Sequence, residues 1–123
     1  MQPYEQLVAW QKSHSLFLLV YRLTARWPKE ERYGLTSQAR RAAFSVPANI
    51  VEGKARYGVP EFRKHVNIAL GSLAELKYAF HAARDLGMVT PEDHTTFLML
   101  AEDASKCGHG LLKALLNAKR GPP

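Results

Sequence analysis

The stretch QARRAAFSVPANIVEGKARY, from Gln38 to Tyr57, largely decides how this chain folds. Small and apolar side chains recur in it at steps of three and four, at Ala39, Ala42, Ala43, Val46 and Ile50. This spacing predicts a helix with one apolar face. Thr36 is expected to cap the start of that helix and Gly53 its end. Pro47 removes a backbone donor, so we expect a kink near Phe44.

Three further helical patterns account for nearly all of the remaining sequence. The first runs from about Tyr4 to Arg26, and the third begins at Pro60 and ends near Leu86. The fourth begins at the sequence TPED, where Thr90 is the N-cap, and continues to about Ala118. Long helices with short connections predict a single all-α domain over residues 1–123, an antiparallel up-down-up-down four-helix bundle.

The first helix carries two apolar stripes instead of one. Its second stripe consists of Leu16, Val20, Leu23 and Trp27. A helix that is apolar on two sides must contact more than one neighbour, so we assign this stripe to an interface between subunits. In the third helix, Gly71 lowers the helix propensity, and we expect it to admit another backbone at close range.

The formal net charge of +6 comes entirely from the first half of the chain. Residues 1–64 hold eleven Lys and Arg against five Glu, whereas residues 65–123 hold six basic and six acidic side chains. Excess positive charge favours polyanionic partners. Arginine suits phosphate, and a tyrosine among cations can stack on a base. The candidate nucleic-acid-binding residues are therefore Arg40, Arg41, Lys54, Arg56, Tyr57, Arg63 and Lys64.

Three alternatives for these charges stay open. The first is a solvated basic surface that has no partner. The second is an ion pair between Arg41 and Glu52, within one helix or across a subunit boundary. In the third, Lys54 and Arg56 only interact with the negative end of the helix dipole.

Little in the sequence points to catalysis. The Glu-x-x-His pairs of di-iron bundles and the glycine patterns of phosphate-binding loops do not occur. We expect no catalytic residue, metal, cofactor or small-molecule substrate. Cys107 is alone, and the run from Leu16 to Tyr21 is shorter than the roughly 20 residues that span a bilayer. These features predict a cytoplasmic protein without membrane contact. We also expect the tail from Lys119 to Pro123 to fray.

A motif in several parts extends over nearly the whole chain. It reads LTxQxRRAAxSVPxNIxEG from Leu35 to Gly53, and it continues in Glu61-Phe62 and in AxGSLxEL from Ala69 to Leu76. This motif resembles that of the bacterial four-helix-bundle proteins encoded by 23S ribosomal RNA intervening sequences. Relatives of that family include the accessory variability proteins of diversity-generating retroelements. The resemblance implies a ring-shaped homo-oligomer, a pentamer, whose basic surface engages RNA or DNA.

Residues and resemblance together predict a non-enzymatic protein that binds nucleic acid through phosphate contacts. No helix-turn-helix, zinc finger or single-strand-binding β fold is visible that would supply base specificity. The resemblance points to structured RNA. The alternative is a protein-interaction adaptor whose basic face docks an acidic partner or a reverse transcriptase that carries its own RNA.

Overall fold

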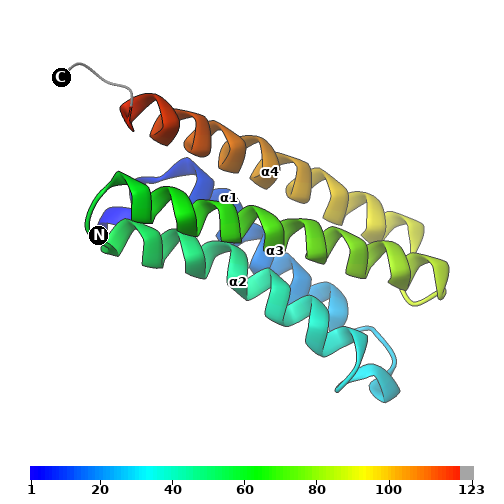
Figure 1. The fold of residues 1–123 in the computed structure, drawn as a ribbon. Coiled ribbons are helices and arrows are strands. Elements are labelled where there is room, and N and C mark those ends of the chain that lie inside the picture. Colours follow the sequence, from blue (N-terminus) through cyan, green and yellow to red (C-terminus); the bar gives the residue numbers. More distant parts are fainter. Residues whose placement is uncertain (120–123) are drawn as a thin grey trace.

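A computed structural model describes residues 1–119 as four α-helices, with no strand in that part of the chain. The helices are α1 (Val8–Thr24), α2 (Leu35–Ala55), α3 (Val59–Asp85) and α4 (Pro91–Lys119), and the 3-10 turns are η1 (Pro3–Gln6) and η2 (Lys29–Glu31). Successive helices run in opposite directions, and each packs against two others (Figure 1). The all-α prediction is confirmed. The predicted fraying of the tail falls on residues 120–123, which lie outside the described residues.

Aromatic rings fill one part of the core and small side chains another. Phe80 and Phe97 are fully buried and stack with their ring centroids 3.7 Å apart. Trp27 packs against Phe80 with a centroid distance of 5.1 Å. α2 instead buries small side chains such as Ala39 and Ala42, and its Gly53 lies close to α3. The α2–α3 contact is accordingly the most extensive in the bundle.

The predicted subunit interface on α1 is wrong. Its four residues, Leu16, Val20, Leu23 and Trp27, are 0 to 6% exposed within a single chain. α1 packs against both α2 and α4, so the stripe that the sequence assigned to a second subunit is buried inside this one. A second copy therefore cannot reach these side chains while the bundle is folded.

Local backbone geometry sets the helix ends. α1 begins at Val8, later than predicted, because Leu7 is extended with a ψ of 122°. The predicted start of α4 is confirmed, because Thr90 Oγ1 accepts the N–H of Asp93 at 3.1 Å. α3 ends at Asp85, within one residue of the predicted end.

The start of α2 differs from the prediction. α2 begins at Leu35, one residue before the predicted cap Thr36. The carboxylate of Glu31 accepts the N–H of Leu35 at 3.0 Å, so this acid does the capping that the sequence assigned to Thr36. α2 continues through the buried Pro47 to Ala55, so the proline does not end the helix, and the kink stays a prediction.

Two glycines have roles opposite to those predicted. Gly53 is not a cap: it lies inside α2, and a Cβ placed there would be 2.8 Å from the Cβ of His65 and 3.0 Å from a ring carbon of Phe62. Gly71 is exposed, and a Cβ placed there would have no heavy atom within 4 Å. The close approach between α2 and α3 therefore depends on Gly53.

Candidate nucleic-acid interface

The predicted nucleic-acid-binding residues divide between the two ends of α2. Arg40 and Arg41 lie near its start, at the end of the bundle where α1 connects to α2 (Figure 1). The others lie around the α2–α3 turn at the opposite end: Lys54, Arg56, Tyr57, Arg63 and Lys64. A rise of about 1.5 Å per residue puts Arg40 and Lys54 roughly 21 Å apart. The structure thus separates the predicted set into two clusters.

The group at the start of α2 is larger than the sequence indicated. Two cations from the α1–α2 connection join it, and we call Lys29, Arg32, Arg40 and Arg41 the corner cluster. Arg32 and Arg40 both line two neighbouring hollows, of about 210 Å³ and about 430 Å³. None of the four cations forms an ion pair within residues 1–119. Their positive charges are therefore available to a ligand.

Arg40 is held in place by neutral groups. Its Nε donates to Thr24 Oγ1 at 2.9 Å, and the centre of its guanidinium lies 4.4 Å from the centroid of the Tyr21 ring. The Thr24 hydroxyl donates in turn to the carbonyl of Val20 at 2.7 Å, so its oxygen is oriented to accept from Arg40. A guanidinium that is fixed in this way loses little conformational entropy when it binds an anion.

The alternative pairing of Arg41 with Glu52 is not formed within the subunit. Arg41 instead donates to the side-chain oxygen of Gln38, its neighbour one turn earlier on α2. Glu52 pairs with Arg56. Arg41 thus keeps its charge and remains exposed beside Arg40.

Sequence reasoning missed Lys29 and Arg32 because two acids lie between them. Glu30 and Glu31 make the connection look neutral when charges are counted along the chain. In the structure the Glu31 carboxylate faces the backbone at the start of α2, and neither acid lines the two hollows. The spacing of three residues between Lys29 and Arg32, typical of one side of a helical turn, was the signal that could have found them.

The group at the α2–α3 turn has a different character, and we call it the turn cluster: Lys54, Arg56, Tyr57, Arg63 and Lys64. Arg56 Nη2 lies 2.9 Å from Glu52 Oε1, and this hydrogen bond raises the pKa of Arg56 and lowers that of Glu52. The Lys54 ammonium lies 5.9 Å from the centroid of the Phe62 ring. Tyr57 is 98% exposed, so its ring is open to solvent. One cation of this cluster is therefore already paired with an acid.

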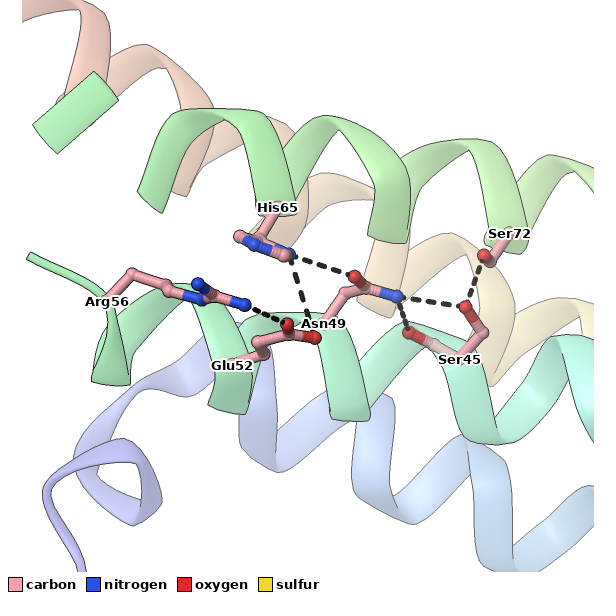
Figure 2. Close-up of polar contacts among 6 residues, drawn as sticks. All are labelled: Ser45, Asn49, Glu52, Arg56, His65 and Ser72. Carbon is pink, nitrogen blue, oxygen red and sulfur yellow. Dashed lines mark hydrogen bonds and ion pairs between the residues drawn. The ribbon is translucent and has the colours of Figure 1, made fainter. Parts of the chain in front are cut away.

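A chain of polar side chains fixes α3 against α2 next to the turn cluster, as Figure 2 shows. Ser45 and Ser72 share a hydrogen bond of 2.7 Å across the two helices. Asn49 Nδ2 donates to Ser45 Oγ at 3.0 Å, and Asn49 Oδ1 lies 3.1 Å from Nδ1 of the buried His65. Because Asn49 Oδ1 can only accept, His65 must carry a proton on Nδ1. Glu52 Oε2 lies 3.9 Å from the same nitrogen. These contacts have a structural role.

An apolar groove runs between α1 and α2, and we call it the aromatic groove. Its lining residues are Tyr4, Trp10, His14, Phe17, Phe44, Pro47, Ala48 and Val51, around a volume of about 340 Å³. The rings of Trp10 and His14 stack at 4.7 Å, and those of Phe17 and Phe44 meet edge to face at 5.8 Å. Phe44 remains 58% exposed. The sequence assigned none of these residues to a surface site.

Two features are absent from residues 1–119. No helix there is long and apolar enough to cross a bilayer. No group of three or more His, Cys, Asp or Glu side chains in that part of the chain could hold a metal ion.

The fold and its surface define an all-α protein of four packed helices, with basic clusters at both ends of the second helix. The family of 23S rRNA-intervening sequence proteins matches over residues 5–110, and the chain belongs to that family. A similar solved structure is that of a protein with unknown function from the S23 ribosomal protein family of Bacteroides thetaiotaomicron. The two align with a TM-score of 0.80 and 21% identity over 86% of this chain and 96% of that one, which shows a shared fold. No curated protein matches the chain.

Proposed function

We propose that this protein is a non-enzymatic, cytoplasmic nucleic-acid-binding protein that contacts the phosphates of structured RNA. The corner cluster is the observation that carries the proposal. It holds four cations without a carboxylate partner in residues 1–119, and Arg40 among them is fixed in advance. The name of the family refers to 23S rRNA, which makes structured RNA the first ligand to test.

The spacing of the two clusters favours recognition of shape. Roughly 21 Å separates the ends of α2 that carry them, so one subunit can contact two distant segments of a folded phosphate backbone. Double-stranded RNA is recognised mainly through its shape, its phosphates and its 2′-hydroxyls. The 98% exposed ring of Tyr57 is available to stack on an unpaired base.

We extend the proposal to a homo-oligomer, a ring of five subunits. Because the α1 stripe is buried, we place the contact between subunits at the aromatic groove instead. A second copy offers a complementary patch on α4, where Leu98 and the 65% exposed Met99 lie beside Glu102 and Asp103. The groove offers the 58% exposed ring of Phe44 to the apolar part of that patch. A contact between two different faces closes into a ring when the rotation permits.

A salt titration tests the function. Binding of a structured RNA and of a DNA duplex is followed by fluorescence anisotropy at low and moderate salt. Six phosphate contacts on a duplex predict a slope of about −5 for log affinity against log salt. Binding that hardly changes with salt would contradict the proposal, and binding of an acidic protein but of no nucleic acid would favour the adaptor.

A pair of matched variants locates the contact. Arg40→Glu with Arg41→Glu reverses two charges of the corner cluster. Lys106→Glu with Lys113→Glu reverses two exposed charges of α4, which form no ion pair in residues 1–119. The first pair should weaken RNA binding strongly and the second little, with both proteins folded by circular dichroism. Light scattering on the Phe44→Glu variant separately tests the groove as a subunit contact, since dissociation to 13.8 kDa is expected.

A further inference from the structure

A small polar pocket lies beside the end of α1 and differs from the rest of the surface. Its volume is about 210 Å³, below the roughly 300–1,000 Å³ of pockets for drug-sized ligands. It is lined by Thr24, Ala25, Trp27, Pro28, Lys29, Arg32, Thr36 and Arg40. The polar side chains in this wall are three cations, two hydroxyls and an indole, with no acid among them. A wall of this composition suits a small anion.

Arg40, the least exposed of the three cations that line this pocket, is already oriented. Arg40 is pinned by Thr24 and by the ring of Tyr21, and no described side chain accepts a hydrogen bond from its two terminal nitrogens. Those nitrogens can therefore donate together to one ligand. Paired donors of this kind suit the oxygens of a phosphate, and charge-assisted hydrogen bonds are the stronger ones.

Trp27 and the start of α2 also form part of the wall. Trp27 is 6% exposed, and its indole N–H is buried without an acceptor in residues 1–119. Thr24 is the last residue of α1, so the negative end of that helix dipole lies at the pocket, beside the positive end of the 21-residue α2, of which Thr36 is the second residue. Such helix starts attract phosphate groups.

Two acids near this end of the bundle are committed elsewhere, and a third, the exposed Glu30, does not line the pocket. The Glu31 carboxylate accepts the backbone N–H of Leu35, and the two carboxylate oxygens of Asp93 accept from Arg26 Nη1 at 3.1 and 2.8 Å. Lys29 and Arg32 form no ion pair within residues 1–119. The positive charge in the pocket is thus not neutralised by the subunit itself.

We propose that this pocket binds the terminal phosphate of a nucleic-acid strand, an inference that rests on the proposed function. A terminal phosphomonoester carries about −1.5 to −2 charges at neutral pH and three acceptor oxygens, which match the three cations that line the pocket. An internal phosphodiester carries one charge and continues in two directions, so a recessed pocket suits it less. The adjoining hollow shares Arg32 and Arg40 and adds the 90% exposed Tyr33, on which the end nucleotide stacks.

The test compares ends of otherwise identical strands. The first pair of probes is a short single-stranded RNA labelled at its 3′ end, with either a 5′-phosphate or a 5′-hydroxyl. The second pair is the same strand labelled at its 5′ end, with either a 3′-phosphate or a 3′-hydroxyl. We expect one phosphorylated end to bind at least about tenfold more tightly than the hydroxyl end. Lys29→Gln with Arg32→Gln should abolish that preference, whereas Lys106→Gln with Lys113→Gln, an equal loss of charge on α4, should retain it.

The outcomes separate this inference from the proposed function. Equal affinity for both ends, with steep salt dependence, overturns the terminal-phosphate pocket and leaves nucleic-acid binding intact. A preference that survives in the Lys29 and Arg32 variant places the end elsewhere and also overturns it. Failure to bind any strand overturns both. Inorganic phosphate is titrated in parallel by thermal shift. If it stabilises the wild type but not the pocket variant, while the RNA ends bind equally, the pocket takes free phosphate and not a strand end.

Discussion

The two ends of α2 carry similar charges, but the side chains that contact these charges differ. At the corner cluster, Arg40 is held by a hydroxyl and an aromatic ring, and no acid pairs with the cations in the described chain. At the turn cluster, Arg56 is paired with Glu52, and Lys54 lies over Phe62. A count of charges along the chain does not distinguish these two ends. What matters is whether the subunit already satisfies each charge.

The structural support at the two ends also differs. The turn cluster stands next to the polar chain from Ser72 to His65 and to the close contact at Gly53, which tie α2 to α3 (Figure 2). The corner cluster draws on a short 3-10 turn, η2, in addition to α2. One end is therefore built for packing, and the other presents cations from two elements around a hollow.

The largest expected effect is on RNA affinity, when two positive charges are removed at one end of α2 or at the other. Arg40→Gln with Arg41→Gln should weaken RNA binding by about 100-fold, since two charge-assisted contacts of about 1.5 kcal/mol each are lost. Lys54→Gln with Arg56→Gln should weaken it by less than about tenfold, because Glu52 already neutralises Arg56. The measurement is fluorescence anisotropy at one fixed salt concentration.

The salt slope provides the control for that comparison. Loss of two phosphate contacts should reduce the slope of log affinity against log salt by about 2 in the corner variant. If the turn variant loses more affinity than the corner variant, the roles assigned to the two ends are reversed.

The next effect concerns stability at the packed end. Gly53→Ala should destabilise the fold, because overpacking costs about 1–3 kcal/mol and the gain in helix propensity returns no more than about 1 kcal/mol. Gly71→Ala is the matched control: its Cβ meets nothing within 4 Å, so it should stabilise by about 0.5–1 kcal/mol. Urea unfolding followed by circular dichroism measures both. A Gly53→Ala protein as stable as the wild type would show that α3 shifts away at little cost.

The sequence was sufficient for the helices because their signals are local. The cap at Thr90 and the apolar spacing of α2 depend on neighbours within a few residues, and both predictions hold. The stripe of α1 that contains Leu16 could not be assigned, because only the packed bundle shows that it is buried within the subunit. The predictions for the two glycines were wrong for the same reason. Whether Gly53 or Gly71 faces a neighbouring helix depends on how its own helix is rotated about its axis relative to that neighbour.

The candidate site was predictable only in part. Arg40 and Arg41 are adjacent on α2, so their proximity follows from the sequence. Lys29 and Arg32 join them only because the chain reverses direction between α1 and α2, and because Glu31 faces away toward Leu35. A count of charges along the sequence reveals neither the chain reversal nor the orientation of the Glu31 carboxylate.

The smallest expected effect comes from Glu52→Gln, which should release Arg56 and make the turn cluster more like the corner. RNA binding should tighten by no more than a few fold, because exposed ion pairs contribute little. The hydrogen bond from Arg56 lowers the pKa of Glu52 in the folded state below its ordinary 4.5. The stability that this pair contributes is therefore present above pH 4.5 and is lost as the pH falls through the lowered pKa.

Thermal melts of the wild type and the Glu52→Gln variant, taken from neutral to acidic pH, should differ slightly at neutral pH and converge in acid. Glu102→Gln is the matched control, because it removes an exposed partner of Lys77, 2.9 Å away, on the α3–α4 side of the bundle. That control should leave RNA binding unchanged. If both variants tighten binding equally, the gain reflects net charge alone, and Arg56 has no particular place in the interface.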